Sequence, residues 1–127
     1  VREKRLKNVI FTDFIPDDQL RWLYEHCRAY IFPSLSEGFG LPGLQAMLYG
    51  VAVVSSNATC LPEVHGDACE YFDPLDVQDM ATKIAGVIDD EAKRNSLIEK
   101  GYIQAGKFSW ERMAQQTLEV YEKALKH

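Results

Sequence analysis

A carboxylate followed by closely spaced glycines is the part of this sequence best suited to chemistry. Glu37 precedes Gly38, Gly40 and Gly43, and a helical spacing of apolar residues begins at Leu41. The first amides of a helix have no acceptor within the helix, and glycines let an oxygen-rich group approach them closely. The segment therefore predicts a site for an anionic group such as a diphosphate, with a carboxylate beside it that accepts hydrogen bonds from hydroxyl groups.

Two plainer interpretations of this segment stay open at the level of the residues. The glycines also fit a tight strand-to-helix turn that needs them for its backbone dihedral angles alone. Glu37 also fits a charge that stabilises the helix N-terminus, which is worth roughly 0.3–1 kcal/mol and requires no ligand.

Strands and helices in alternation are expected to position this segment. Short apolar runs predict strands at residues 8–12, 29–33, 51–54 and 68–72. Helical spacing begins at Asp17 and again at Leu41, and the second half of the chain predicts helices that pack together, with Asp76 and Ser109 as N-caps. This order predicts an α/β fold: a Rossmann-like parallel sheet with flanking helices. Ligands of such folds bind beyond the carboxyl ends of the strands, where residues 34–42 lie.

Composition and charge exclude several classes of protein. The 127 residues include 14 Lys plus Arg and 19 Asp plus Glu, a net charge of −5, so nucleic acid is not an expected partner. Residues 38–62 carry no charged side chain, but glycines, prolines and polar side chains interrupt them and exclude a spanning helix. Three cysteines without a CxxC pair favour a reducing, cytoplasmic location. No metal site and no cofactor are expected.

Several segments resemble, in the right order, retaining glycosyltransferases of the group 1 (family 4) type. The signature of that family is matched by PSLSEGFGLPGLQAMLYGVAVVSS at residues 33–56. Further matches are FTDFIPDDQL at residues 11–20, LPEVHGDACEYFDP at residues 61–74 and FSW at residues 108–110. The likeness covers nearly the whole chain and is far more specific than a lone glycine motif.

The resemblance implies that residues 1–127 are a single partial domain, the C-terminal donor-binding domain of a two-domain GT-B glycosyltransferase. Such an enzyme transfers a hexose from a nucleotide-diphosphate sugar to an acceptor with retention of configuration. Glu37 matches the first glutamate of the family motif and is expected to be the catalytic residue that contacts the transferred sugar. The residues expected to bind the donor are Gly38, Phe39, Gly40, Leu41 and Gln45.

Two departures from the family pattern limit the expected activity. Gln45 occupies the position of the second glutamate, which usually holds the ribose hydroxyls, so weaker donor binding or altered specificity is expected. No segment resembles the strand-helix units that carry the diphosphate-neutralising Arg and Lys, and the N-terminal acceptor domain is missing too. We expect no transfer by this chain alone. The alternatives are a noncatalytic nucleotide-sugar-binding or oligomerising module, and a phosphate-binding Rossmann domain of an unrelated enzyme.

The absence of those strand-helix units also affects whether this chain is expected to associate with other chains. Without them, the strand expected at residues 8–12 has lost its neighbours, so it either pairs beside residues 29–33 or presents an apolar edge to another chain. We favour self-association through this edge. The resemblance also leaves room for peripheral membrane association of the full enzyme.

Overall fold

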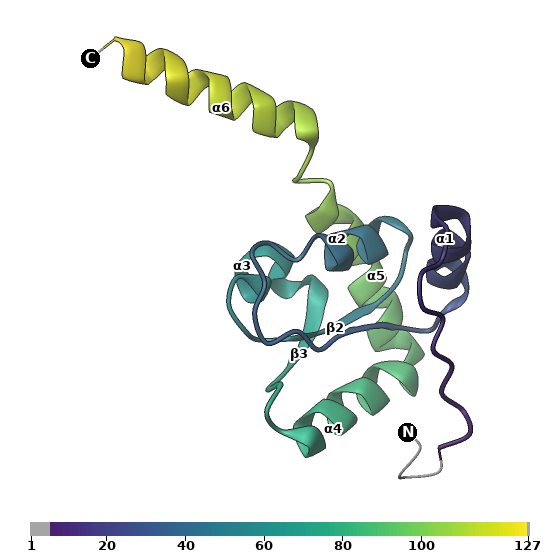
Figure 1. The fold of residues 1–127 in the computed structure, drawn as a ribbon. Helices are drawn as coiled ribbons and strands as arrows, with labels where there is room; N and C mark the ends of the chain where they lie inside the picture. Colours follow the sequence, from purple (N-terminus) through teal and green to yellow (C-terminus); the bar gives the residue numbers. More distant parts are fainter. Residues whose placement is uncertain (1–5, 127) are drawn as a thin grey trace.

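A three-stranded parallel sheet forms the centre of the molecule, which we describe from a computed structural model over residues 6–126 (Figure 1). The strands are β1 (Tyr30–Phe32), β2 (Val53–Ser56) and β3 (Cys69–Phe72), and they lie side by side in that order. The helices are α1 (Asp17–His26), α2 (Leu41–Leu48), α3 (Leu61–His65), α4 (Val77–Ile88), α5 (Glu91–Ala105) and α6 (Trp110–Leu125), and a 3-10 turn covers Gly66–Ala68. The expected α/β fold is confirmed.

The central strand β2 is buried on both faces of the sheet. Val53 packs in one cluster with Leu44 and Met47 of α2, whereas Val54 packs in a second cluster with Val87 of α4. Successive side chains of a strand point to opposite faces, so each face of β2 needs its own helical cover. This double cover explains why the strand is a nearly continuous apolar run in the sequence.

The predicted N-caps of two helices are confirmed. The Asp76 carboxylate accepts hydrogen bonds from the amides of Gln78 (2.9 Å) and Asp79 (3.1 Å) at the start of α4. The Ser109 hydroxyl accepts one from the amide of Arg112 (3.1 Å) at the start of α6. Both caps satisfy amides that have no acceptor within the helix.

The strand predicted at residues 8–12 is wrong. These residues form no strand and do not pair with β1, and the side chains of Ile10 and Phe11 are 86% and 73% exposed. An apolar run becomes a strand only where a neighbouring strand supplies hydrogen-bond partners for its backbone. The described chain offers none at this place, so the segment runs along the surface towards α1 (Figure 1).

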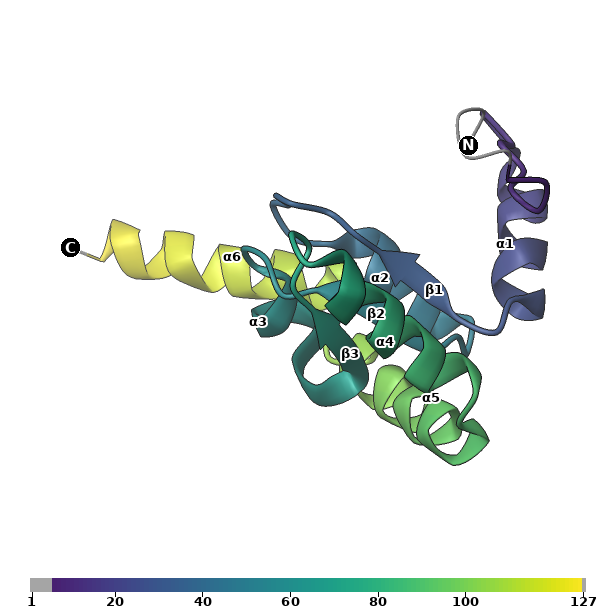
Figure 2. The same cartoon turned by 90° about the horizontal axis from the view of Figure 1, so that it is seen from below.

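The expectation that all C-terminal helices pack against the body is wrong for α6. This helix has no buried residue, and it projects away from the sheet in both views (Figures 1 and 2). Trp110 and Tyr121 are 71% and 64% exposed, so the apolar spacing of α6 does not form part of this core. Among residues 6–126, no helix has the length and apolarity that crossing a bilayer requires.

Candidate active site

The site is built on the loop that joins β1 to α2, at the carboxyl end of the sheet. Two serines fix this loop to the strands. The Ser56 hydroxyl at the end of β2 donates to the Ser34 carbonyl oxygen (2.5 Å), and the Ser34 hydroxyl donates to Oε1 of Glu37 (2.7 Å). The carboxylate is therefore anchored where ligands of parallel sheets bind.

Three groups hold Glu37 in place. Besides the bond from Ser34, the Glu37 amide donates to Oγ1 of Thr59 (3.2 Å), and the Glu37 carbonyl oxygen accepts from Sγ of Cys60 (3.3 Å). Thr59 has a positive φ of 51°, which is unusual for a β-branched residue. The Glu37 side chain is half-buried, and its Oε2 atom accepts no hydrogen bond from the described residues. One carboxylate oxygen is thus free to meet a hydroxyl group.

A run of unpaired amides follows Glu37 directly. Within residues 6–126, the amides of Gly38, Phe39, Gly40 and Leu41 donate no hydrogen bond. Gly40 adopts a left-handed conformation with a φ of 89° and serves as the N-cap of α2. These donors lie at the positive end of the helix dipole, an arrangement that favours an anion.

A buried histidine supports this loop from within. Nε2 of His65, the last residue of α3, lies 3.0 Å from the carbonyl oxygen of Gly40, which also accepts the Gly43 amide (3.1 Å). The His65 side chain is fully buried. Burial lowers the pKa of His65 below its ordinary value, and the bond to Gly40 only partly offsets that effect.

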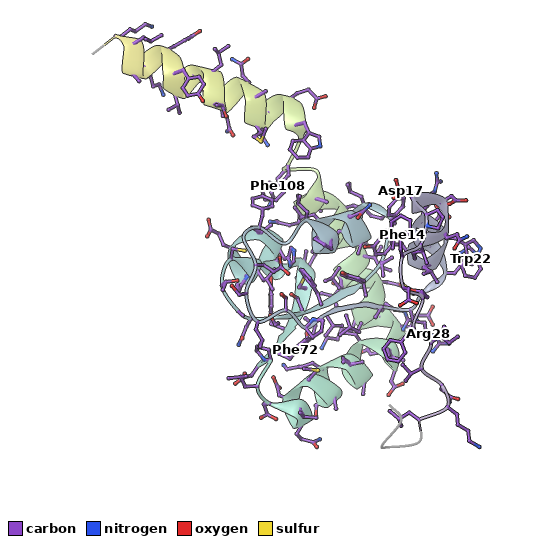
Figure 3. All side chains as sticks on the ribbon, viewed as in Figure 1. Phe14, Asp17, Trp22, Arg28, Phe72 and Phe108 are labelled. Atoms are coloured by element: carbon purple, nitrogen blue, oxygen red, sulfur yellow. The ribbon has the colours of Figure 1, made fainter. Side chains whose placement is uncertain are left out.

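Gln45 shares a groove with the loop. The groove has a volume of about 850 Å³, and its lining includes Phe39, Gln45, Phe108 and the cations Lys107 and Arg112. The rings of Phe39 and Phe108 meet edge to face at 5.5 Å. Phe108 lies where the chain leaves α5 for α6 (Figure 3). The groove therefore joins the loop between β1 and α2 to the N-terminal end of α6.

The two cations of the groove were missed by sequence reasoning. Lys107 donates from Nζ to Oε1 of Gln104 (2.7 Å), and Arg112 donates from Nη1 to the carbonyl oxygen of Lys107 (2.8 Å). Both residues belong to the junction of α5 and α6. The family resemblance instead predicts cations on the two strand-helix units that no segment of this sequence resembles. Positive charge thus lines the groove that Gln45 also lines, at positions outside the family motif.

Glu37 and the amides of residues 38–41 follow one another in the loop before α2 and form the edge of the site. Phe39, Leu41 and Gln45 line the groove, whereas Glu37, Gly38 and Gly40 do not. Their roles towards a donor stay predictions. Sequence reasoning did not identify the residues that hold this edge, which are Ser34, Ser56, Thr59, Cys60 and His65. The described residues hold no cluster of three or more His, Cys, Asp or Glu side chains that could bind a metal ion.

Comparison with known proteins identifies the family of the chain. Residues 2–104 match the family described as "Glycosyl transferases group 1". The O-antigen chain mannosyltransferase B of Escherichia coli is 43% identical over 112 residues, which are 88% of this chain and 29% of that protein. A serotype-specific mannosyltransferase WbdA of the same species is 44% identical over 92% of this chain and 14% of its own length.

A solved structure shares the fold. The sucrose-phosphate synthase of Thermosynechococcus elongatus superposes with a TM-score of 0.83 at 26% sequence identity, over 98% of this chain and 32% of that one. The fold and the site thus define part of a GT-B glycosyltransferase domain. The chain belongs to the glycosyl transferases group 1. It spans less than a third of the length of these relatives.

Proposed function

We propose that this chain is the C-terminal donor-binding part of a cytoplasmic glycosyltransferase that transfers a hexose, with retention, from a nucleotide-diphosphate sugar. The observation that carries the proposal is the edge formed by the anchored Glu37 carboxylate and the unpaired amides of residues 38–41. Mannose is the proposed sugar, because the names of the two E. coli relatives specify mannosyltransferases at 43% and 44% identity.

Each part of the edge has a distinct task in this proposal. The unpaired amides and the helix dipole stabilise the negative charge that develops on the diphosphate as it leaves. Oε2 of Glu37 accepts a hydrogen bond from a hydroxyl of the transferred sugar and so orients it. The acceptor is supplied from an N-terminal domain outside this chain, which explains why the chain alone is expected to be inactive.

A segment exchange tests the proposal. This chain replaces the matched segment of the E. coli O-antigen chain mannosyltransferase B, and transfer from a mannosyl donor is measured. We expect the hybrid to transfer mannose and Glu37→Gln to lower the rate roughly 100-fold, because an interaction at the reacting sugar is lost. Glu99→Gln, a change at an exposed carboxylate of α5, is the control and should leave the rate unchanged.

The second candidate, a noncatalytic nucleotide-sugar-binding module, is favoured by Gln45 at the position of the second family glutamate. It predicts a folded hybrid that binds the donor but transfers nothing. That result would contradict the proposed enzymatic function.

A further inference from the structure

The peptide unit between Gly40 and Leu41 is oriented from inside the protein. In a trans peptide the C=O and N–H bonds point in opposite directions. The Gly40 carbonyl oxygen points inward, to Nε2 of the fully buried His65 (3.0 Å), and it also accepts the Gly43 amide of the first turn of α2 (3.1 Å). The Leu41 N–H on the other side of the same peptide plane therefore points away from His65, and no acceptor in the described chain receives it.

The hydrogen bond defines the tautomer of His65. A carbonyl oxygen only accepts, so Nε2 must carry the proton and donate it. In the neutral ring, Nδ1 is then an acceptor, and it is buried without a partner among the described residues. A second proton on Nδ1 would have no acceptor there, so the ring acts as a single fixed donor to Gly40.

Two glycines make room for this ring. A Cβ atom at Gly43 would lie 2.5 Å from both Nε2 and Cε1 of His65, and one at Gly40 would lie 3.2 Å from Nε2. Real Cβ atoms do not approach other atoms as closely as the first of these distances. The absence of both side chains lets the imidazole lie directly against the loop and the first turn of α2.

The peptide unit between Glu37 and Gly38 is oriented in the same way, by Cys60. Sγ of Cys60 donates to the Glu37 carbonyl oxygen (3.3 Å), so the Gly38 N–H on that peptide points away from Cys60. Cys60 immediately precedes α3 and His65 ends it. The N-cap and the last residue of α3 thus each donate to a carbonyl oxygen of the loop, and the Gly38 and Leu41 amides point away from these two donors.

We propose that His65 is a positioning residue, which aims the Leu41 amide at the anionic part of the donor by holding the Gly40 carbonyl oxygen. The inference rests on the proposed function for the identity of the ligand, but the orientation of the peptide is independent of it. His65 does not touch the donor in this account. Its contribution is to fix one donor amide before the ligand arrives, which lowers the cost of ordering the loop on binding.

The wild-type chain provides the first test. Nitrogen-15 NMR of the 127-residue chain should find a neutral His65 with its proton on Nε2. A proton on Nδ1 instead would overturn the proposal, because no hydrogen bond to Gly40 could then form.

Two variants of similar size provide the second test. His65→Gln retains an amide donor within reach of Gly40, whereas His65→Leu removes it. Residual dipolar couplings should report a changed orientation of the Leu41 N–H in His65→Leu and the wild-type orientation in His65→Gln. Unchanged couplings of the later α2 amides show that each variant is folded. A wild-type Leu41 coupling in His65→Leu would overturn the positioning role.

Titration with GDP-mannose and UDP-glucose separates this inference from the proposed function. For whichever donor binds, His65→Leu should weaken binding about tenfold and His65→Gln about twofold or less, as expected for one hydrogen bond to a charged group. A wild-type chain that binds neither would contradict the proposed function, while the dipolar couplings would still decide the role of His65. Equal affinity of wild type and His65→Leu would overturn the inference alone.

Discussion

Gln45 is the residue at which this chain differs most clearly from the family motif. It is exposed on α2 and lines the groove beside Phe39. Gln45→Glu should tighten donor binding about fivefold, because a charge-assisted hydrogen bond to a hydroxyl exceeds a neutral one by about 1 kcal/mol. Isothermal titration calorimetry measures the change. Gln116→Glu, which adds the same charge on the α6 side of the groove, should bind the donor as the wild type does. An unimproved affinity of Gln45→Glu would refute a role at the ribose.

His65 should make the stability of the chain depend on pH. Its pKa in the folded state is lowered from 6.5, mainly by burial. The unfolded chain therefore takes up the proton at a higher pH than the folded chain does. The contribution of His65 to stability is fully present above pH 6.5 and is lost as the pH falls towards the folded-state pKa. Urea unfolding at about pH 8 and about pH 5.5 should show a smaller loss on acidification in His65→Gln than in wild type. Identical losses would contradict this.

The carboxylate and the glycine loop could be predicted from the sequence, but the groups that hold them could not. Glu37 and Gly40 are neighbours in a recognisable pattern of residue types. Thr59, Cys60 and His65 meet that pattern only across 22 to 25 positions of sequence. Contacts of this kind depend on how α3 packs beneath the loop. Neither periodicity nor local spacing carries that information.

Among the elements, α4 depends on a cap that is visible in the sequence. Asp76→Ala removes the acceptor for two amides and should lower the free energy of unfolding by about 1 kcal/mol. Urea denaturation measures this change. Asp76→Asn keeps an acceptor oxygen and should lose much less. Equal losses in the two variants would show that the carboxylate charge, and not the capping bond, stabilises the helix.

The correctly predicted helices have capping residues and a long helical spacing of apolar residues. The helix that the sequence did not predict, α3, and the strand that it predicted wrongly, at residues 8–12, lack such evidence. α4 and α6 have N-caps and long helical spacing. α3 has five residues, too few for an apolar period to appear. The run at residues 8–12 has the composition of a strand, but a strand also requires a partner, and composition does not specify one.

At the scale of the whole molecule, apolar side chains are exposed at several places, and two of these are the segments at either end of the described chain. One is the N-terminal segment with Ile10 and Phe14, which are 86% and 92% exposed, and the other is α6, where Leu125 is 87% exposed. Patches of this kind favour association. We propose that the isolated chain self-associates through them, although the N-terminal segment is not the strand edge that the sequence predicted.

Sedimentation equilibrium tests self-association. The average mass of the wild-type chain should rise with concentration. Phe14→Lys together with Leu125→Lys should shift the chain towards monomer without loss of stability, because both side chains are exposed. Leu75→Lys, a change at an equally exposed leucine before α4, is the control and should associate as wild type does. A wild-type chain that stays monomeric at every concentration would contradict the proposal.

The alternation of strands and helices defined the fold class before the structure, because the apolar patterns of β2 and its covering helices are continuous. The sequence does not show which of the apolar helix faces are buried by other residues of this chain. α6 has the pattern of a packed helix, but none of its residues is buried within residues 6–126. An amphipathic pattern predicts a contact but not the molecule or the segment that provides it.

We propose that the Glu37 carboxylate and the amides of residues 38–41 bind an activated sugar, and this binding is the basis of the proposed function. Its most direct test is a titration of the nitrogen-15-labelled chain with GDP- and UDP-sugars, followed through its amide resonances. We expect one of these donors to shift the amide resonances of Gly38, Phe39, Gly40 and Leu41 together, and Glu37→Gln to weaken this response. Saturation by every donor without movement of those four amides would contradict it.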